Sequence, residues 1–110
     1  MDTLLVFTNF PNRESALKVA EYLIGERLAA CVNVLAHCTS VYRWQGVTET
    51  AEEVPVLIKT PASLYAQVEG AIRERHPYEV PEIIAVPVVQ GLAAYLEWVV
   101  AETCAPGAGP

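Results

Sequence analysis

The feature that most constrains the fold of this chain is the order in which strand-like and helix-like hydrophobic patterns follow one another. Residues 3–10 are mostly β-branched, apolar or aromatic, and a Pro-Asn pair ends the run, which is typical of a buried strand leading into a turn. Asn12 can cap a helix that runs to about Leu28, because apolar residues recur there at three- and four-residue steps. The chain therefore begins with a strand followed by a helix.

The next segment is too long for one regular strand. Residues 30–44 are rich in Val, Thr, Tyr and Trp, and their length predicts a bent or bulged strand that ends at a Gln45-Gly46 turn. Residues 53–60 predict the strand that follows. Pro55 inside this strand cannot donate a hydrogen bond to a neighbour, so we expect an edge or a bulge at this point. An open edge of this kind favours pairing with another chain.

Three further elements complete the pattern. Thr60 and Pro61 are a typical helix start, a capping hydroxyl followed by a proline in the first turn, and this helix is predicted to stop at His76. Residues 81–89 predict the fourth strand, and a short last helix follows Gly91. Both helices have apolar faces, formed by Leu64, Val68 and Ile72 in the first and by Leu92, Tyr95, Leu96, Val99 and Val100 in the second.

This order of elements predicts an α+β fold, a ferredoxin-like βαββαβ sandwich with an extra C-terminal helix. A chain of 110 residues has room for one domain, which we place at residues 1–104. Residues 105–110 (APGAGP) are expected to form a flexible tail, because this composition cannot hold regular structure.

The apolar residues exceed what one small core can hide. Hydrophobic residues make up 53% of the chain and charged residues 18%, although a chain of this size leaves much of its surface exposed. One interpretation is a tightly packed monomer; the other, which we favour, is that apolar surface is buried between subunits. The sheet face opposite the two helices also needs a cover, which a homotrimer with its sheets packed face to face would supply. The residues behind this expectation are Cys31, Val32, Val34, Val86 and Val88.

Composition argues against several classes of partner. Seven basic residues against 13 acidic ones give a net charge of -6, and no basic stripe is present, so nucleic acid is not an expected partner. The first residues lack a basic segment ahead of a long apolar run, and no apolar window is long enough to span a bilayer. We therefore expect no membrane partner and a cytoplasmic location. Three cysteines without a CxxC spacing predict reduced thiols.

Five short blocks, spread over nearly the whole chain and in one order, resemble the CutA (divalent-cation-tolerance) family. They are AACVN at 29–33, SVYRWQG at 40–46, LIKT at 57–60, HPYEVPEI at 76–83 and YLEW at 95–98. The resemblance implies a CutA-like domain, a homotrimer built by strand pairing between neighbours, and an architecture similar to that of the PII signalling proteins. It also implies a role in tolerance of divalent metals, especially copper. No reaction comes with it, and no nucleophile elbow, P-loop or HExxH helix is present, so an enzyme is not expected.

The HPYEVPE block is the densest set of polar groups, and its two prolines stiffen the loop that presents them. His76 is a candidate ligand for copper or another divalent metal ion, with Cys31 as a candidate thiolate partner. The alternative interpretations are that the block joins the second helix to the fourth strand and that Cys31 is a packed core residue. Family members discussed as copper binders carry Cys and His where this chain has Thr8 and Arg75.

A second group of candidate residues resembles the family's aromatic and basic lining of the cleft between subunits. With a tyrosine and a glutamate of the HPYEVPE block it makes up the predicted ligand-binding cleft: Tyr42, Arg43, Trp44, Lys59, Tyr78 and Glu82. One interpretation is that the aromatic residues anchor the subunit interface. The other is a pocket for a small anionic ligand, with Lys59 or Arg43 as the counter-charge.

Three functional hypotheses follow. The first is a trimeric binding or sensing protein whose clefts take a metal ion or a small ligand. The second is an interaction scaffold that docks a partner protein without binding metal. The third is a minor hydrolase activity in the cleft between subunits.

Overall fold

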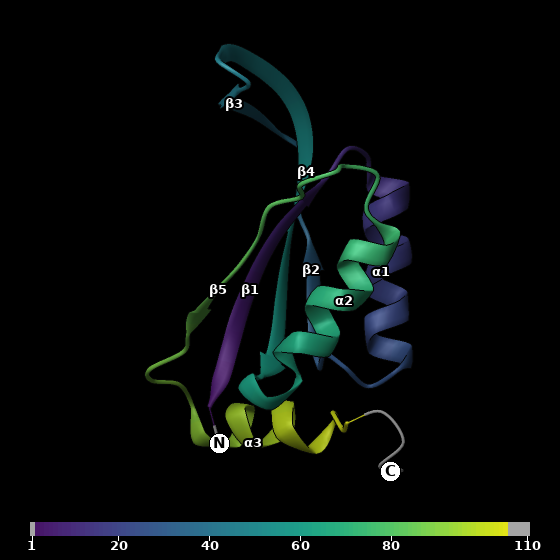
Figure 1. The fold of residues 1–110 in the computed structure, drawn as a ribbon. Helices are drawn as coiled ribbons and strands as arrows, with labels where there is room; N and C mark the ends of the chain where they lie inside the picture. The colour runs from purple at the N-terminus through teal and green to yellow at the C-terminus, as the bar shows by residue number, and fades with distance from the viewer. Residues whose placement is uncertain (1, 106–110) are drawn as a thin grey trace.

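An antiparallel sheet forms the centre of the molecule, and its strands are ordered β2-β4-β1-β5, with β3 pairing to the outer part of β4 (Figure 1). The computed structural model describes residues 2–105, so the predicted tail at 105–110 lies, except for Ala105, outside the described residues. The elements are β1 Thr3–Phe10, α1 Arg13–Gly25, β2 Cys31–Val34, β3 Cys38–Trp44, β4 Val47–Pro61, a 3-10 helix Ala62–Leu64, α2 Tyr65–Arg75, β5 Ile83–Pro87 and α3 Ala93–Ala101.

The strand order confirms the predicted ferredoxin-like α+β fold. β1 lies between β4 and β5, antiparallel to both, and β2 pairs with the other side of β4. Helices α1 and α2 pack side by side on one face of the sheet, and α3 crosses the end of the sheet (Figure 1). Within the described residues no helix is long and apolar enough to cross a membrane.

The core lies between the sheet and the two helices. Alternate residues of β1 point into it, so Val6 and Phe10 are fully buried, and each faces a buried β4 partner across the register. The helices contribute residues at the predicted spacing, with Leu23 of α1 and Val68 and Ile72 of α2 completely buried. The apolar patterns that predicted the strand and the helices therefore form one core.

The first helix begins as predicted and ends three residues early. The side chain of Asn12 accepts a hydrogen bond from the Ser15 amide at 2.8 Å, as an N-cap residue should. α1 ends at Gly25, and Arg27 then takes a positive φ of 59°. Leu28 still reaches the core, although it does so from the loop and not from the helix.

The segment at 30–44 is broken into two strands and not bent as one. β2 ends at Val34 and β3 begins at Cys38, and β3 forms a hairpin with the first half of β4 that projects beyond the sheet (Figure 1). β4 starts directly after the Gln45-Gly46 turn, well before the predicted start at Glu53. The chain thus has a long, partly free-standing hairpin that the sequence did not predict.

Pro55 lies inside a central strand and not at a sheet edge. It faces Asn9 of β1, and on its other side β4 changes partners, because β3 pairing stops at Glu53 and β2 pairing starts at Val56. Pro55 therefore lies where the hydrogen-bond ladder between β4 and its second neighbouring strand is interrupted. A missing backbone N–H costs least stability at such a point.

The predicted start of the second helix is also displaced. Thr60 and Pro61 belong to the end of β4, and a 3-10 helix separates them from α2. The Thr60 hydroxyl donates to the Leu28 carbonyl at 2.7 Å and so ties β4 to the loop after α1. Thr60 is a buried strand residue and not a helix cap.

The face of the sheet that points away from α1 and α2 is partly uncovered. Register places Leu5, Lys59, Cys31 and Val86 on this open face, in one row across the four strands. The neighbouring row includes Ile84, and the two β5 side chains are 43% (Val86) and 55% (Ile84) exposed. Val32 and Val34, expected on the same face, pack instead against the helix-side core.

A pocket between the hairpin and the 78–82 loop

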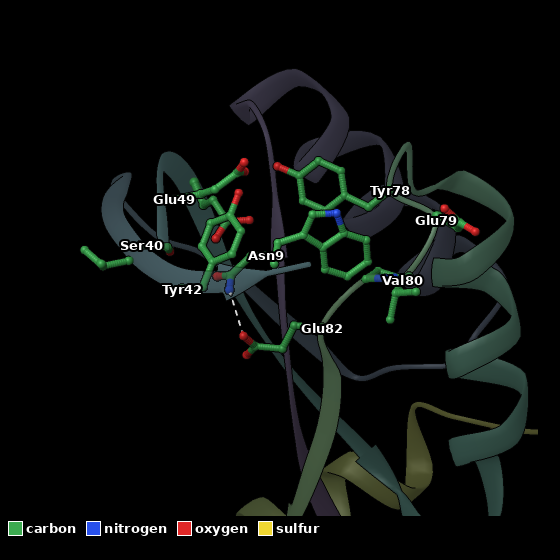
Figure 2. A pocket seen from close by; sticks show the side chains of 12 residues that line it. Asn9, Ser40, Tyr42, Glu49, Tyr78, Glu79, Val80 and Glu82 are labelled. Carbon is green, nitrogen blue, oxygen red and sulfur yellow. Dashed lines mark hydrogen bonds between the residues drawn. The ribbon is translucent and has the colours of Figure 1, made fainter. Parts of the chain in front are cut away.

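A cleft of about 730 Å³ opens between the β3–β4 hairpin and the loop that leads into β5, and we call it the hairpin pocket (Figure 2). Its lining combines three aromatic rings with four carboxylates. The lining residues are Asn9, Ser40, Val41, Tyr42, Trp44, Glu49, Glu53, Tyr78, Glu79, Val80, Pro81 and Glu82. None of these described residues is Lys or Arg.

The hairpin supplies one wall of the pocket through the two-residue period of its strands. Tyr42 and Trp44 lie on the same face of β3, and Glu49 is the cross-strand partner of Tyr42. Glu53 follows Glu49 by four residues on β4 and therefore points to the same side. Arg43, between the two aromatic residues, points to the opposite side of the hairpin and is not among the lining residues.

The 78–82 loop supplies the other wall, and His76 holds it in place. The His76 ring is buried, its Nε2 hydrogen-bonds to the Asn9 carbonyl, and its Nδ1 accepts the Tyr78 amide at 3.2 Å. A carbonyl can only accept, so the proton of the ring is on Nε2. The ring also lies 4.4 Å from Phe10 and 4.7 Å from Tyr78, measured between ring centroids.

The electrostatics of the pocket depend on one buried acid, Glu53, that lies close to a phenol. Glu53 exposes only 8% of its surface. Burial raises the pKa of Tyr78, and the charges of Glu53 and Tyr42 and a hydrogen bond with Glu53 raise that pKa further. On the loop side, Asn9 donates to the carboxylate of Glu82 at 3.2 Å (Figure 2). A ligand here meets negative charge on both walls.

The structure does not bring together His76 and Cys31, the two predicted metal ligands. Cys31 is in register with Leu5, whereas His76 contacts Asn9, four residues further along β1, or about 13 Å along the strand. Both ring nitrogens of His76 are already hydrogen-bonded, so neither nitrogen is available to bind a metal ion. Residues 2–105 contain no group of three or more His, Cys, Asp or Glu side chains placed to hold a metal ion.

The predicted ligand cleft is divided between two places in the single chain. Tyr42, Trp44, Tyr78 and Glu82 all line the hairpin pocket. Lys59 lies on the open face instead, where its ammonium group hydrogen-bonds to Asn33 and approaches the Cys31 sulfur at 3.9 Å. Burial raises the pKa of Tyr95, and the nearby Cys31 adds to this effect, so the phenol belongs to the same cluster. Arg43 and Lys59 therefore stay a prediction for a cleft that forms between subunits.

Asn9, Glu49 and Glu53 are among the lining residues that were not predicted from the sequence. A usable signal existed for Glu49, because a two-residue turn at Gln45-Gly46 pairs Trp44 with Val47 and hence Tyr42 with Glu49. Asn9 had no such signal. Its place in the pocket depends on contacts with Glu82, which is 73 residues away along the chain.

Known proteins match this chain over nearly its whole length. The family model described as CutA1 divalent ion tolerance protein matches residues 4–102. The human protein CutA is 45% identical over 93 residues, which are 84% of this chain and 52% of the human protein. The divalent-cation tolerance protein CutA of Thermus thermophilus is 40% identical over 94 residues, 86% of this chain and 91% of that protein. The chain thus spans about half the length of the human relative.

Solved structures agree with the sequence relatives. The crystal structure of CutA from Xylella fastidiosa matches with a TM-score of 0.91 at 42% identity, covering 94% of this chain and 100% of that one. The divalent cation tolerance protein of Thermus thermophilus matches with the same TM-score at 38% identity, covering 93% and 99%. With the family model matching almost all of the described residues, the chain belongs to the CutA1 divalent ion tolerance family.

Proposed function

We propose that this chain works as a homotrimeric binding protein in divalent-cation tolerance, that its hairpin pocket takes a small ligand, and that a metal ion would bind in a cleft between subunits. The observation that carries the proposal is the pocket itself, whose volume lies in the range of small-molecule sites and whose polar groups converge from two walls. In this proposal the protein senses its ligand in the cytoplasm, as PII-like architecture suggests, and catalyses no reaction.

Three features of the single chain support the trimer. The open face carries apolar side chains that a soluble monomer would expose, including Ile84 and Val86. The hairpin projects away from the sheet, and its aromatic residues Tyr42 and Trp44 are each 41% exposed. Within the described residues β3 pairs only with β4, so its outer edge is free to pair with a neighbouring subunit.

If the protein binds a metal ion, we propose that the ion is copper or another divalent cation. The relatives from Thermus thermophilus and Pyrococcus horikoshii are named divalent-cation tolerance proteins, which supports testing metals first. A metal site would combine ligands from more than one subunit, with Cys31, which lies half-buried on the open face, as the candidate thiol. His76 is left out of this site because both of its nitrogens are engaged.

Titration calorimetry on the full chain tests the proposal. Copper, zinc and a panel of small anions, cations and neutral compounds are titrated separately at equal ionic strength. We expect saturable binding of at least one class, and Trp44→Leu should weaken it if the ligand occupies the hairpin pocket. The proposal fails if no metal or compound binds above the level seen with an unrelated protein of similar charge.

The second candidate function is a scaffold that docks a partner protein. The observation that favours it is the apolar surface of α3, where Tyr95 and Trp98 stack at 5.5 Å while both remain about 40% exposed. A partner on this surface would be lost in a Trp98→Asp variant that keeps its oligomeric mass. If Trp98→Asp instead dissociates the oligomer, the surface belongs to the subunit interface and the scaffold proposal loses its support.

A further inference from the structure

The hairpin pocket contains a buried carboxylate, Glu53, for which residues 2–105 supply no counter-charge. Among the residues that the structure describes, ion pairs join Lys18 to Glu14 and Arg75 to Glu74, and none of the pocket carboxylates takes part in one. Glu53 is more than nine-tenths buried, and the polar side chain beside it is the neutral Tyr78 phenol. A buried carboxylate without a cation is unfavourable, so this site favours a positively charged occupant.

The aromatic residues of the pocket strengthen the same preference. Tyr42, Trp44 and Tyr78 each expose about two-fifths of their surface, and all three line the cavity. Figure 2 shows the Tyr42 and Tyr78 rings on opposite sides of the pocket, with Glu49 beside Tyr42 on the hairpin side. Ring faces attract ammonium groups through their quadrupole and also cover the methylene groups that connect such groups.

The arrangement of the carboxylates indicates an extended cation. Glu49 and Glu53 come from the hairpin, whereas Glu79 and Glu82 come from the loop, so the charges stand on two walls of a cleft of about 730 Å³. A single ammonium group can contact one wall. A chain with two or more ammonium groups separated by methylene groups can contact both and fill the aromatic space between them.

From these observations we propose that the hairpin pocket binds a linear organic polycation of the polyamine class. This inference rests on the proposed function, because it names the ligand class of the same pocket. It differs in sign from the small anionic ligand predicted for a cleft between subunits, because Arg43 and Lys59 do not line the hairpin pocket of the single chain. The net charge of -6 acts in the same direction by attracting cations at long range.

The test uses spermidine as the probe and triethylene glycol as an uncharged chain of similar length, both titrated into the full chain in its native oligomeric state. We expect saturable spermidine binding that weakens as salt is raised, and no binding of triethylene glycol. Glu53→Gln removes the buried charge and keeps the shape, so it should weaken spermidine binding about tenfold or more.

Glu52→Gln is the matched control. Glu52 directly precedes Glu53 on β4. It accepts a hydrogen bond from Thr39 at 2.7 Å, and it does not line the pocket. This variant should bind spermidine within about twofold of the unchanged protein, because an exposed charge outside the site acts weakly. Trp44→Leu should weaken binding while leaving all four carboxylates in place. Circular dichroism of each variant establishes that it is folded.

Two results overturn the inference. One is spermidine binding no tighter than triethylene glycol, and the other is an equal loss in Glu52→Gln and Glu53→Gln, which would mean nonspecific attraction to a negative surface. If copper, zinc or an anion binds and spermidine does not, the polyamine inference fails while the proposed function stands. If nothing binds at all, both fail.

Discussion

His76 is held by both nitrogens of its ring, and this fixes the loop wall of the hairpin pocket. We expect His76→Ala to lower the free energy of unfolding by roughly 2–3 kcal/mol, because it removes two partly buried hydrogen bonds and the packing on Phe10. Urea denaturation measures the change. His37→Ala is the matched control, since His37 is exposed and should change stability by less than about 0.5 kcal/mol.

The same pair of variants separates structure from metal binding. If His76 were a metal ligand, His76→Ala would abolish any copper binding while changing the stability of the metal-free protein little. The hydrogen bonds of the ring predict the opposite, a destabilised protein whose metal binding, where present, is retained at temperatures at which it is folded.

The raised pKa of Tyr78 predicts how the stability of the protein changes at alkaline pH. The folded protein keeps the phenol proton to a higher pH than the unfolded chain, whose tyrosines ionise near pH 10. Stability from this group is therefore fully present below about pH 10 and is lost as pH rises toward the folded pKa. Ultraviolet titration of the protein and of Tyr78→Phe isolates the phenol by difference.

Glu53→Gln tests the cause of that shift. The pKa of Tyr78 should move toward its ordinary value but stay above it, because burial is the larger cause and the charge of Glu53 is the next. A Tyr78 that ionises at or below the pH of a free tyrosine would contradict the arrangement of the pocket.

At the scale of secondary-structure elements, the hairpin turn depends on backbone geometry that only glycine adopts freely. Gly46 has a φ of +81° and follows Gln45 at +49°, and a Cβ at Gly46 would meet nothing within 4 Å. Gly46→Ala should therefore destabilise the protein by about 1 kcal/mol through strain alone. Thermal denaturation measures this change.

Gly70 provides the matched comparison. It lies in α2, a Cβ there also meets nothing within 4 Å, and its φ is in the normal range. Gly70→Ala should stabilise the protein by about 0.5–1 kcal/mol, because alanine is the better helix former. Equal effects of the two substitutions would mean that the positive φ at Gly46 does not strain the turn.

Elements whose signals are local could be predicted from the sequence, and those decided by a distant partner could not. The strand at 3–10 and the Asn12 cap were predicted correctly, because the residues that define them are neighbours in the chain. Thr60 was misassigned because its role depends on the loop after α1, and Pro55 was expected at an edge or bulge but lies where β4 changes partner from β3 to β2. The hydrogen bond of His76 to Asn9 could not be predicted for the same reason, since the two residues are 67 positions apart in the chain.

At the scale of the whole molecule, the open face is the feature that most needs an explanation. Ile84→Glu would place a charge in the proposed subunit interface and should convert the trimer to a folded monomer. Leu17→Glu is the control, because Leu17 is also a half-exposed apolar residue but lies on α1, on the helix side of the sheet. Sedimentation of both variants shows whether the effect is specific to the open face.

The proposed clefts between subunits, the covering of the open face and the pairing of the free β3 edge all require a trimer. Multi-angle light scattering of the full chain at micromolar concentration measures the mass directly. We expect three times the 12.0 kDa of one chain, unchanged on dilution through the micromolar range. A stable species of 12.0 kDa that exposes the open face to water would contradict it.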